Sequence, residues 1–206
     1  MELVTFIIPS LNRPTLIRAI KSLESQINHD WRCIIVFDGL DKDLKIPSSK
    51  EIKIKVMKTE KLGDAGLVRN VALPFVETDW IAFLDDDDIV KPTYVEKLKY
   101  YVRREHNRID AVHFSIERSD GSLEPALNQC VGMSCGGISY AVKTSFVLKN
   151  NIIFDAGFGE DKRFFEQCKK KGKPFITYDP QYFACGRSWW HGESAKIVTY
   201  PVKLFN

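Results

Sequence analysis

The chain lacks any long hydrophobic run. Among its 206 residues, no stretch approaches the roughly 18 to 20 consecutive apolar residues that a helix needs to cross a bilayer. The first five residues include no Lys or Arg, whereas a secretory signal peptide begins with a positively charged segment. We therefore expect a soluble cytoplasmic protein without a transmembrane segment, and leave peripheral association with a membrane open.

Cysteine pairs with the spacing of a metal site or a disulfide framework are also missing. The five cysteines are an odd number and are spread along the chain: Cys33, Cys130, Cys135, Cys168 and Cys185. Such a distribution is typical of free thiols in a reducing compartment.

A strong charge of one sign is absent as well. The 30 basic and 27 acidic residues give a net charge of +3, which is too small to indicate nucleic-acid binding. Bases nevertheless gather in residues 97–108 and 169–173. Solvated helix faces are the default interpretation of these runs, with a membrane surface or an anionic acceptor as the alternatives.

What the chain does contain is an alternation of short apolar runs and helical patterns. Residues 3–8, 32–37 and 80–84 predict buried strands, residues 52–56 an edge strand, and residues 14–27 and 63–73 helices. Such an alternation predicts a parallel, doubly wound α/β sheet, buried on both faces.

The second half has a different rhythm. A helix is expected from residue 92, strands at 110–115, 138–143 and 174–184, a hairpin turn at 119–122, and a helix at 160–171. We find no internal repeat and no low-complexity linker, so a single domain is expected.

Four consecutive aspartates, residues 85–88, directly follow the apolar run at 80–84. Carboxylates this close raise each other's pKa, whereas a divalent cation lets them stay ionised as hard oxygen ligands. Open α/β sheets bind ligands beyond the carboxyl ends of their strands, which is where this run is expected. The sequence therefore predicts a Mg²⁺ or Mn²⁺ site, although an acidic run can also be a solvated turn.

Alternate residues of an extended strand face opposite sides. If the backbone stays extended, Asp85 and Asp87 therefore cannot share a role with Asp86 and Asp88. The run offers two overlapping Asp-x-Asp registers, and both stay open at this point.

Four segments in order resemble the family 2 glycosyltransferases, which transfer a sugar from a nucleotide diphosphate donor: residues 5–13, 34–39, 63–70 and 83–92. The resemblance implies an α/β fold of the GT-A type. In that fold a single Rossmann-like, mostly parallel sheet is flanked by helices and carries a smaller antiparallel elaboration on the acceptor side. It also implies one domain, 1–206, in which residues 1–100 bind the nucleotide sugar. Residues 101–206, with a C-terminal tail, would then bind the acceptor.

The resemblance further implies a set of donor contacts. The backbone after the first strand would hold the nucleotide base, through Pro9, Ser10, Asn12 and Arg13. Asp38 would accept a hydrogen bond from the base edge, such as the imide N–H of uracil, although Asp-Gly is also an ordinary turn.

Further donor contacts are expected at the next two segments. Gly63 precedes a helix whose free N–H groups and positive dipole end suit a phosphate. Arg69 would bridge a phosphate or an aspartate, or else lie on the surface. By resemblance Asp85 meets the ribose or the sugar, with Asp86 as the alternative, and Asp87 binds the metal.

A late histidine often closes over the diphosphate in this family, which makes His191 a candidate metal or phosphate ligand. Lone histidines are more often structural. The neighbouring Trp189 and Trp190 either stack on a sugar ring or serve as packing anchors.

One-step inversion at a sugar carbon needs a carboxylate on the face opposite the leaving group. Residues 157–163 resemble the family's glutamate–aspartate pair at the start of a late helix, which implies Asp161 as the catalytic base. The alternative is that Glu160 and Asp161 merely favour a helix N-terminus, as acids do.

We therefore predict a metal-dependent, inverting glycosyltransferase that moves a sugar from a UDP-linked or related donor. The acceptor would be a hydroxyl of a glycan, or of a lipid-linked or protein-linked molecule. A sugar nucleotidyltransferase is the rival enzyme, but it usually needs a glycine-rich loop after the first strand, and residues 9–14 contain no glycine. A non-catalytic nucleotide-sugar binding module is the second rival. An acidic cleft disfavours nucleic acid.

Overall fold

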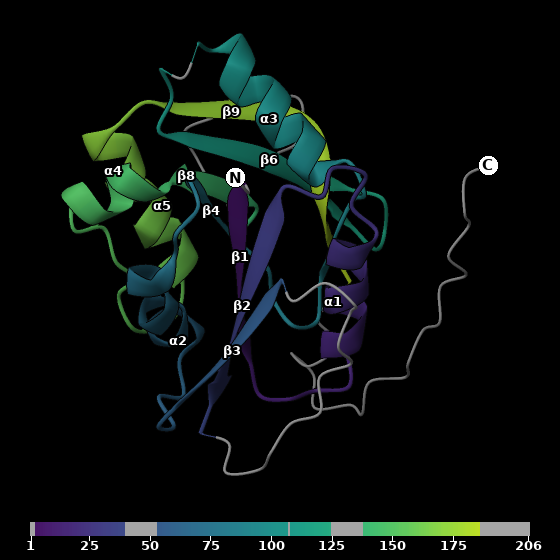
Figure 1. The fold of residues 1–206 in the computed structure, drawn as a ribbon, viewed down its shortest axis with the longest axis vertical. Coiled ribbons are helices and arrows are strands. Elements are labelled where there is room, and N and C mark those ends of the chain that lie inside the picture. The colour runs from purple at the N-terminus through teal and green to yellow at the C-terminus, as the bar shows by residue number, and fades with distance from the viewer. Residues whose placement is uncertain (1–2, 40–52, 107, 125–137, 186–206) are drawn as a thin grey trace.

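A computed structural model describes residues 3–39, 53–106, 108–124 and 138–185 of the chain (Figure 1). Within these residues the strands form one nine-stranded sheet, with helices on both faces. No helix in the described segments is both long and apolar enough to cross a membrane.

The amino-terminal half of the sheet is parallel. Its order is β3-β2-β1-β4, with these strands: β1 (Val4–Ser10), β2 (Trp31–Asp38), β3 (Ile54–Thr59) and β4 (Trp80–Phe83). All residues of β1 and β4 are buried, because they lie at the centre of the sheet with helices on either side. Strand β3 lies at the edge of the sheet, as the sequence predicts, but its burial does not alternate strictly, because Lys55 and Val56 are both exposed.

Two helices cover opposite faces of this half. Helix α1 (Leu16–Glu24) buries residues at helical spacing, Leu16, Ala19, Ile20 and Leu23. Helix α2 (Ala65–Ala72), continued by the 3₁₀ turn η1 (Leu73–Phe75), lies on the other side of the strands (Figure 1). The chain therefore changes direction at β1, and ligands of such sheets bind at this switch point, beyond the carboxyl ends of β1 and β4.

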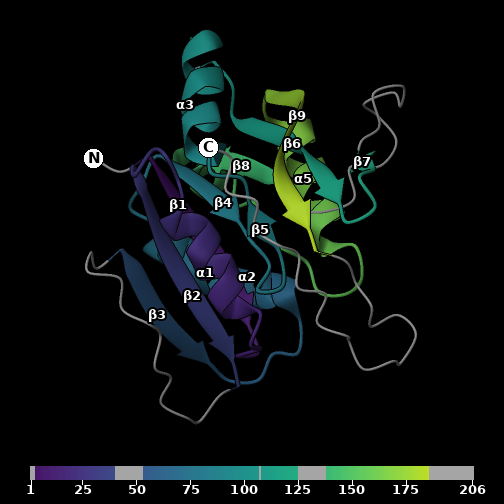
Figure 2. The same cartoon turned by 90° about the vertical axis from the view of Figure 1, so that its right-hand side faces the viewer.

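The sheet continues from β4 as β8-β6-β9-β5, and β7 pairs with β6 (Figure 2). These strands are β5 (Ile89–Val90), β6 (Ala111–Arg118), β7 (Leu123–Glu124), β8 (Tyr140–Lys143) and β9 (Pro174–Ala184). Strand β8 is antiparallel to both β4 and β6, and β5 is antiparallel to β9. The mixed α/β sheet with antiparallel strands in its second half is thus confirmed.

Three further helices belong to this half: α3 (Tyr94–Arg104), α4 (Thr144–Lys149) and α5 (Glu160–Lys171). The predicted bounds of α5 and β9 are confirmed, and a turn joins β6 to β7, where the N–H of Arg118 donates to the carbonyl of Ser122 at 2.9 Å. Pro9 does not end the first strand, which continues to Ser10. Strand β5 and helix α4 were not predicted.

An aromatic cluster supports the second half behind the switch point. Phe83 of β4 contacts Phe154 and Phe164 with ring centroids 5.1 and 5.5 Å apart, and Phe154 stacks on Phe164 at 4.1 Å. These contacts hold α5 against the sheet. Among the described cysteines, Cys33, Cys168 and Cys185 are free thiols, as expected, while Cys130 and Cys135 lie outside the described residues.

Candidate active site

The acidic run is attached to the end of β1. Ser10 Oγ donates to Asp86 Oδ2 at 2.7 Å, which buries the Asp86 carboxylate. Arg13 Nη1 lies 3.5 Å from Asp86 Oδ1 and 3.4 Å from Asp87 Oδ2. The backbone between them turns at Asn12, where φ is +60° and the N–H donates to Ser10 Oγ. The switch point thus joins Ser10 and Arg13 of the first segment to the aspartates of the fourth.

The run of aspartates does not stay extended. The N–H of Asp88 donates to the carbonyl of Asp85 at 3.2 Å, which closes a turn just after β4. Because of this turn, Asp85, Asp87 and Asp88 each bring one carboxylate oxygen within 4.8 Å of the others, while Asp86 points to Ser10. We call these three residues the aspartate triad. Strand alternation does not separate the roles of these residues, because the backbone here turns instead of staying extended.

Asp88 is held by the last described strand. Its carboxylate accepts hydrogen bonds from Tyr182 Oη and from the N–H of Cys185, both at 2.9 Å. Tyr182 Oη also accepts from the N–H of Asp85 at 3.2 Å. Strand β9 therefore reaches back over the turn and fixes its shape.

The electrostatics of the triad favour a cation. Burial, together with the charges of Asp85 and Asp86, raises the pKa of Asp87. Burial and the charges of Asp85 and Asp87 raise the pKa of Asp88 to about 7, against the hydrogen bonds that lower it. Three carboxylates that repel one another in a half-buried turn are a suitable donor set for Mg²⁺ or Mn²⁺, so these residues fit the predicted metal.

Arg69 of α2 links this turn to α5. Its side chain is only 2% exposed, and its Nη2 lies 2.5 Å from Asp85 Oδ1 while its Nη1 lies 3.3 Å from Glu160 Oε1. The guanidinium also lies 5.3 Å from the centre of the Phe154 ring. Arg69 is thus a buried bridge between carboxylates and not a surface arginine, and its contact with a phosphate stays a prediction.

Asp38 shapes the loop that leads to α2. Its two carboxylate oxygens accept from the N–H groups of Leu62 at 2.5 Å and Gly63 at 2.9 Å. Gly63 has a φ of +68°, a left-handed conformation that favours glycine. A contact between Asp38 and a nucleotide base also stays a prediction.

Helix α2 begins one residue after Asp64, later than the sequence indicates. Asp64 caps it by accepting from the N–H of Leu67 at 3.1 Å, and its second oxygen accepts from the N–H of Gly157 at 2.7 Å. Part of the helix N-terminus is therefore used internally. A Cβ on Gly66 would lie 2.8 Å from Glu160 Cγ, so α2 packs directly on the start of α5.

Asp161 follows Glu160 at this start of α5. Its Oδ1 accepts from the N–H of Lys162 at 2.7 Å, and its carbonyl accepts from Tyr140 Oη at 3.1 Å. Contacts from Glu160 through Arg69 to Asp85 connect the start of α5, which carries the predicted base Asp161, to the triad. His191, Trp189 and Trp190 lie outside the described residues.

Sequence reasoning missed three parts of this arrangement. Asp88 was part of the recognised run but received no role, and Glu160 was considered only as the neighbour of the base. Tyr182 carries no local signal, because its role arises from a contact 94 residues away along the chain.

Comparisons with known proteins concern the family and the fold of this chain. The sequence profile described as "Glycosyl transferase family 2" matches residues 5–160. An uncharacterised glycosyltransferase of Haemophilus influenzae is 30% identical over 106 residues, which cover 51% of this chain and 36% of the relative. The Escherichia coli UDP-Glc:alpha-D-GlcNAc-diphosphoundecaprenol beta-1,3-glucosyltransferase WfgD is 32% identical over 90 residues, 42% of this chain and 36% of the relative. The chain thus spans about a third of the length of these two relatives.

The fold is also similar to a solved structure, that of S. aureus TarS 1-349 in complex with UDP-GlcNAc. The TM-score is 0.74 at 18% sequence identity, covering 95% of this chain and 62% of TarS 1-349. At this identity the likeness concerns the fold alone. The profile match, in contrast, runs from β1 to the start of α5, which is most of the chain, and so this protein belongs to glycosyl transferase family 2.

Proposed function

We propose that this chain transfers a sugar from a nucleotide diphosphate donor to a hydroxyl acceptor. The observation that carries the proposal is the aspartate triad at the switch point of the sheet, connected through Arg69 to Glu160 and its neighbour Asp161. Inverting sugar transfer of this kind needs a metal that binds the donor diphosphate and a separate carboxylate that acts as the base. The triad and the pair Glu160 and Asp161 would supply these two functions.

The donor is proposed to be a UDP-sugar. The E. coli relative uses UDP-Glc by its name, and the TarS structure holds UDP-GlcNAc. On this chain the nucleotide would lie over the carboxyl end of β1, at Pro9, Ser10, Asn12 and Arg13, with Asp38 beside the base. Ser10 and Arg13 already bind the Asp86 carboxylate at this position. The backbone of Asp86 and the neighbouring residue Asp85 would then contact the ribose or the sugar.

The metal, Mn²⁺ or Mg²⁺, would be held by the triad, with Asp87 as the predicted principal ligand and Asp85 and Asp88 beside it. When bound, it would neutralise the negative charge that develops on the departing diphosphate. Arg13 lies near Asp87 and adds positive charge to the same position.

Asp161 is proposed as the base. It would accept the proton of the acceptor hydroxyl while the acceptor oxygen bonds to the anomeric carbon. The bond from that carbon to the diphosphate oxygen breaks on the opposite face, which inverts the configuration. Its place at the start of α5 gives it a fixed position, because Tyr140 and Lys162 bind the same residue.

The test is donor hydrolysis across a panel of nucleotide sugars, each with Mn²⁺ or with a chelator. Hydrolysis of one donor with Mn²⁺ but not with the chelator supports the proposal. Equal hydrolysis under both conditions contradicts the proposed metal dependence. Release of pyrophosphate from a nucleoside triphosphate and a sugar phosphate would instead identify a nucleotidyltransferase. Donor binding without any turnover, with every acceptor offered, would indicate a binding module.

A further inference from the structure

The segment that precedes α5 lies in a fixed register along one side of that helix. Lys171 Nζ donates to the carbonyl of Asn150, and Gln167 Nε2 donates to that of Ile153, both at 2.8 Å. One turn earlier, Arg163 donates to the carbonyls of four consecutive residues, 155–158, at 2.7 to 3.3 Å. Residues 150–158 therefore form a firmly anchored surface alongside α5.

Three large apolar side chains stand exposed on and beside this segment. Leu148 is 52% exposed, Ile153 44% and Phe158 86%. Phe158 lies between Gly157 and Gly159, both at positive φ, and its carbonyl is bound by Arg163. The exposed ring of Phe158 is therefore carried by a backbone that hydrogen bonds hold in place. We call these three residues the apolar ridge.

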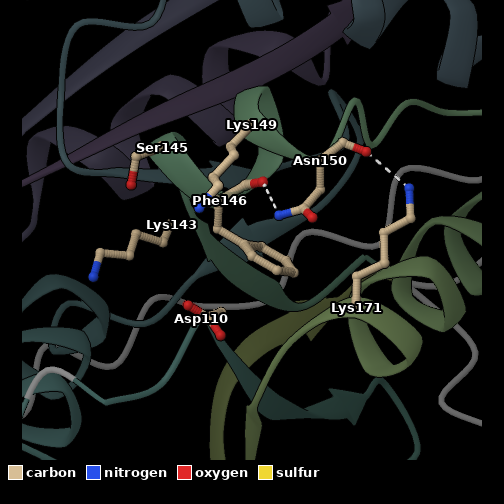
Figure 3. Close-up of a pocket in the computed structure, with 7 residues that line it drawn as sticks. All are labelled: Asp110, Lys143, Ser145, Phe146, Lys149, Asn150 and Lys171. Carbon is tan, nitrogen blue, oxygen red and sulfur yellow. Dashed lines mark hydrogen bonds between the residues drawn. The ribbon is translucent and has the colours of Figure 1, made fainter.

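A basic pocket adjoins the end of the ridge at Leu148. It has a volume of about 350 Å³ and is lined by Asp110, Lys143, Ser145, Phe146, Lys149, Asn150 and Lys171. Figure 3 shows Phe146 at its centre, with Lys143 and Ser145 on one side and Asn150 and Lys171 on the other. The lining thus includes three lysines and a single acid, and Asp110 already accepts from the N–H of Lys173 at 3.0 Å.

We propose that the apolar ridge and the basic pocket together form a docking surface for an anionic lipid bilayer. Apolar side chains that enter the headgroup boundary and lysines that pair with lipid phosphates are the two contributions that hold peripheral proteins on such membranes. A protein partner is less suited to this surface, because lysine is depleted in protein interfaces.

Docking would also orient the proposed reaction. The ridge ends at Phe158, two residues before Glu160. The lipid surface would therefore lie beside the part of the site that is proposed to bind the acceptor. This consequence rests on the proposed function, whereas the docking itself does not. A lipid-linked or membrane-bound acceptor is the class that such a placement serves.

Sedimentation with vesicles tests the docking without donor or acceptor. We use phosphatidylcholine vesicles with 30 mol% phosphatidylglycerol, vesicles of phosphatidylcholine alone, and about 0.1 M salt, at which surface charges act over about 10 Å. Wild-type protein is expected to sediment with the anionic vesicles only. The double variant Lys143→Glu/Lys149→Glu should bind them at least about tenfold more weakly, and Phe158→Ser likewise.

Matched controls come from elements that lie away from α4, namely α1, the residues after it, and β3 (Figure 1). Lys21→Glu/Lys55→Glu changes the net charge equally on α1 and β3, and Ile27→Ser removes another exposed apolar side chain; both should bind as wild type. Circular dichroism checks that each variant is folded.

The proposal is overturned if wild type stays in solution with anionic vesicles, or if the controls weaken binding as much as the test variants. A dimer that Phe158→Ser dissociates, without vesicle binding, would overturn it in favour of a second copy. Donor hydrolysis of the same samples reports the proposed function separately.

Discussion

Among single residues, Arg69 is notable because one buried guanidinium bridges two carboxylates from different parts of the chain. Removing one partner of a buried charge group leaves the others uncompensated, which typically costs about 3 to 5 kcal/mol. We therefore expect Arg69→Met to lower the free energy of unfolding by about 3 kcal/mol in urea denaturation. Arg32→Met is the control, because Arg32 pairs with Glu77 on the surface and should change stability by less than about 1 kcal/mol. Equal losses in both variants would contradict the structural role of Arg69.

His113 predicts a pH dependence of stability. It is fully buried in β6, neither ring nitrogen has a hydrogen-bond partner, and burial, followed by the charge of Lys169, lowers its pKa to about 4. The unfolded chain, with a histidine pKa near 6.5, binds this proton first, so the folded state loses stability as pH falls from about 6.5 to 4. Between pH 7 and pH 5 the contribution is about 2 kcal/mol.

Urea denaturation of wild type and His113→Leu at the two pH values measures this contribution. Wild type should lose about 2 kcal/mol more than the variant on going to pH 5. The comparison between the two proteins is essential, because aspartates with raised pKa values, such as Asp88, act in the opposite direction in both. Identical pH profiles would show that His113 is not the group responsible.

Asp161 separates chemistry from binding. If it is the base, Asp161→Asn should reduce the rate of transfer by about 10² to 10⁴ while leaving donor affinity unchanged, because the residue would contact the acceptor hydroxyl. The measurements are kcat for transfer and the Kd for the UDP-sugar by calorimetry. A variant that loses donor binding would place Asp161 in the donor site instead.

The sequence located the acidic run correctly but could not assign its members. The side chains of Asp85 and Asp87 point to the same place because the N–H of Asp88 closes a turn. Tyr182, far along the chain, supports that turn through its contact with the N–H of Asp85. Arg69 could be read only as a surface or bridging residue, since helical spacing does not reveal which face of α2 meets Glu160. The residue types indicated the chemistry of the site, but they did not indicate where the side chains point.

Among the elements, α2 depends on the residue that caps its start. Asp64 uses one oxygen for the N–H of Leu67 and the other for the N–H of Gly157. Loss of a helix cap costs about 1 to 2 kcal/mol, and the Gly157 contact is lost with it. We expect thermal unfolding to rank Asp64→Ala below Asp64→Asn and both below wild type, because Asn keeps an acceptor for Leu67 only. An alanine variant as stable as wild type would contradict the cap.

Elements with a long, regular pattern were predicted well. Helix α5 and strand β9 were predicted with their observed ends, since twelve and eleven residues give periodicity enough to identify. Helix α4 has six residues and β5 two, too few for any period, and both exist because neighbouring strands position them. Pro9 remains within β1 because central packing outweighs its usual role as a strand end.

For the whole molecule, a metal at the triad would be coupled to folding. A ligand that binds only the native state at 100 times its Kd stabilises by about 2.7 kcal/mol, so Mn²⁺ should raise the thermal midpoint by about 5 °C or more. Asp87→Ala should abolish the increase and, without metal, should be at least as stable as wild type, because it relieves repulsion. Asp79→Ala, at the other end of β4, is the matched control and should respond to Mn²⁺ like wild type. A shift that persists in Asp87→Ala would remove the triad from the metal assignment.

The overall α/β class followed from the sequence, but the order of the strands did not. Alternating strands and helices indicate a parallel sheet, and this holds for β1 to β4. The continuation through β8, β6 and β9 depends on contacts between residues tens of positions apart, which no local pattern reports.

The contact between Asp88 and strand β9 also sets an order of events during synthesis. The ribosome produces the aspartates almost a hundred residues before Tyr182 and Cys185, the two groups that later donate hydrogen bonds to Asp88. Domains fold as units while synthesis proceeds at about 5 to 20 residues per second. For several seconds the emerging chain therefore carries Asp88 without the two groups that later bind its carboxylate. The sheet can close, and the turn can take its final form, only when β9 has left the exit tunnel.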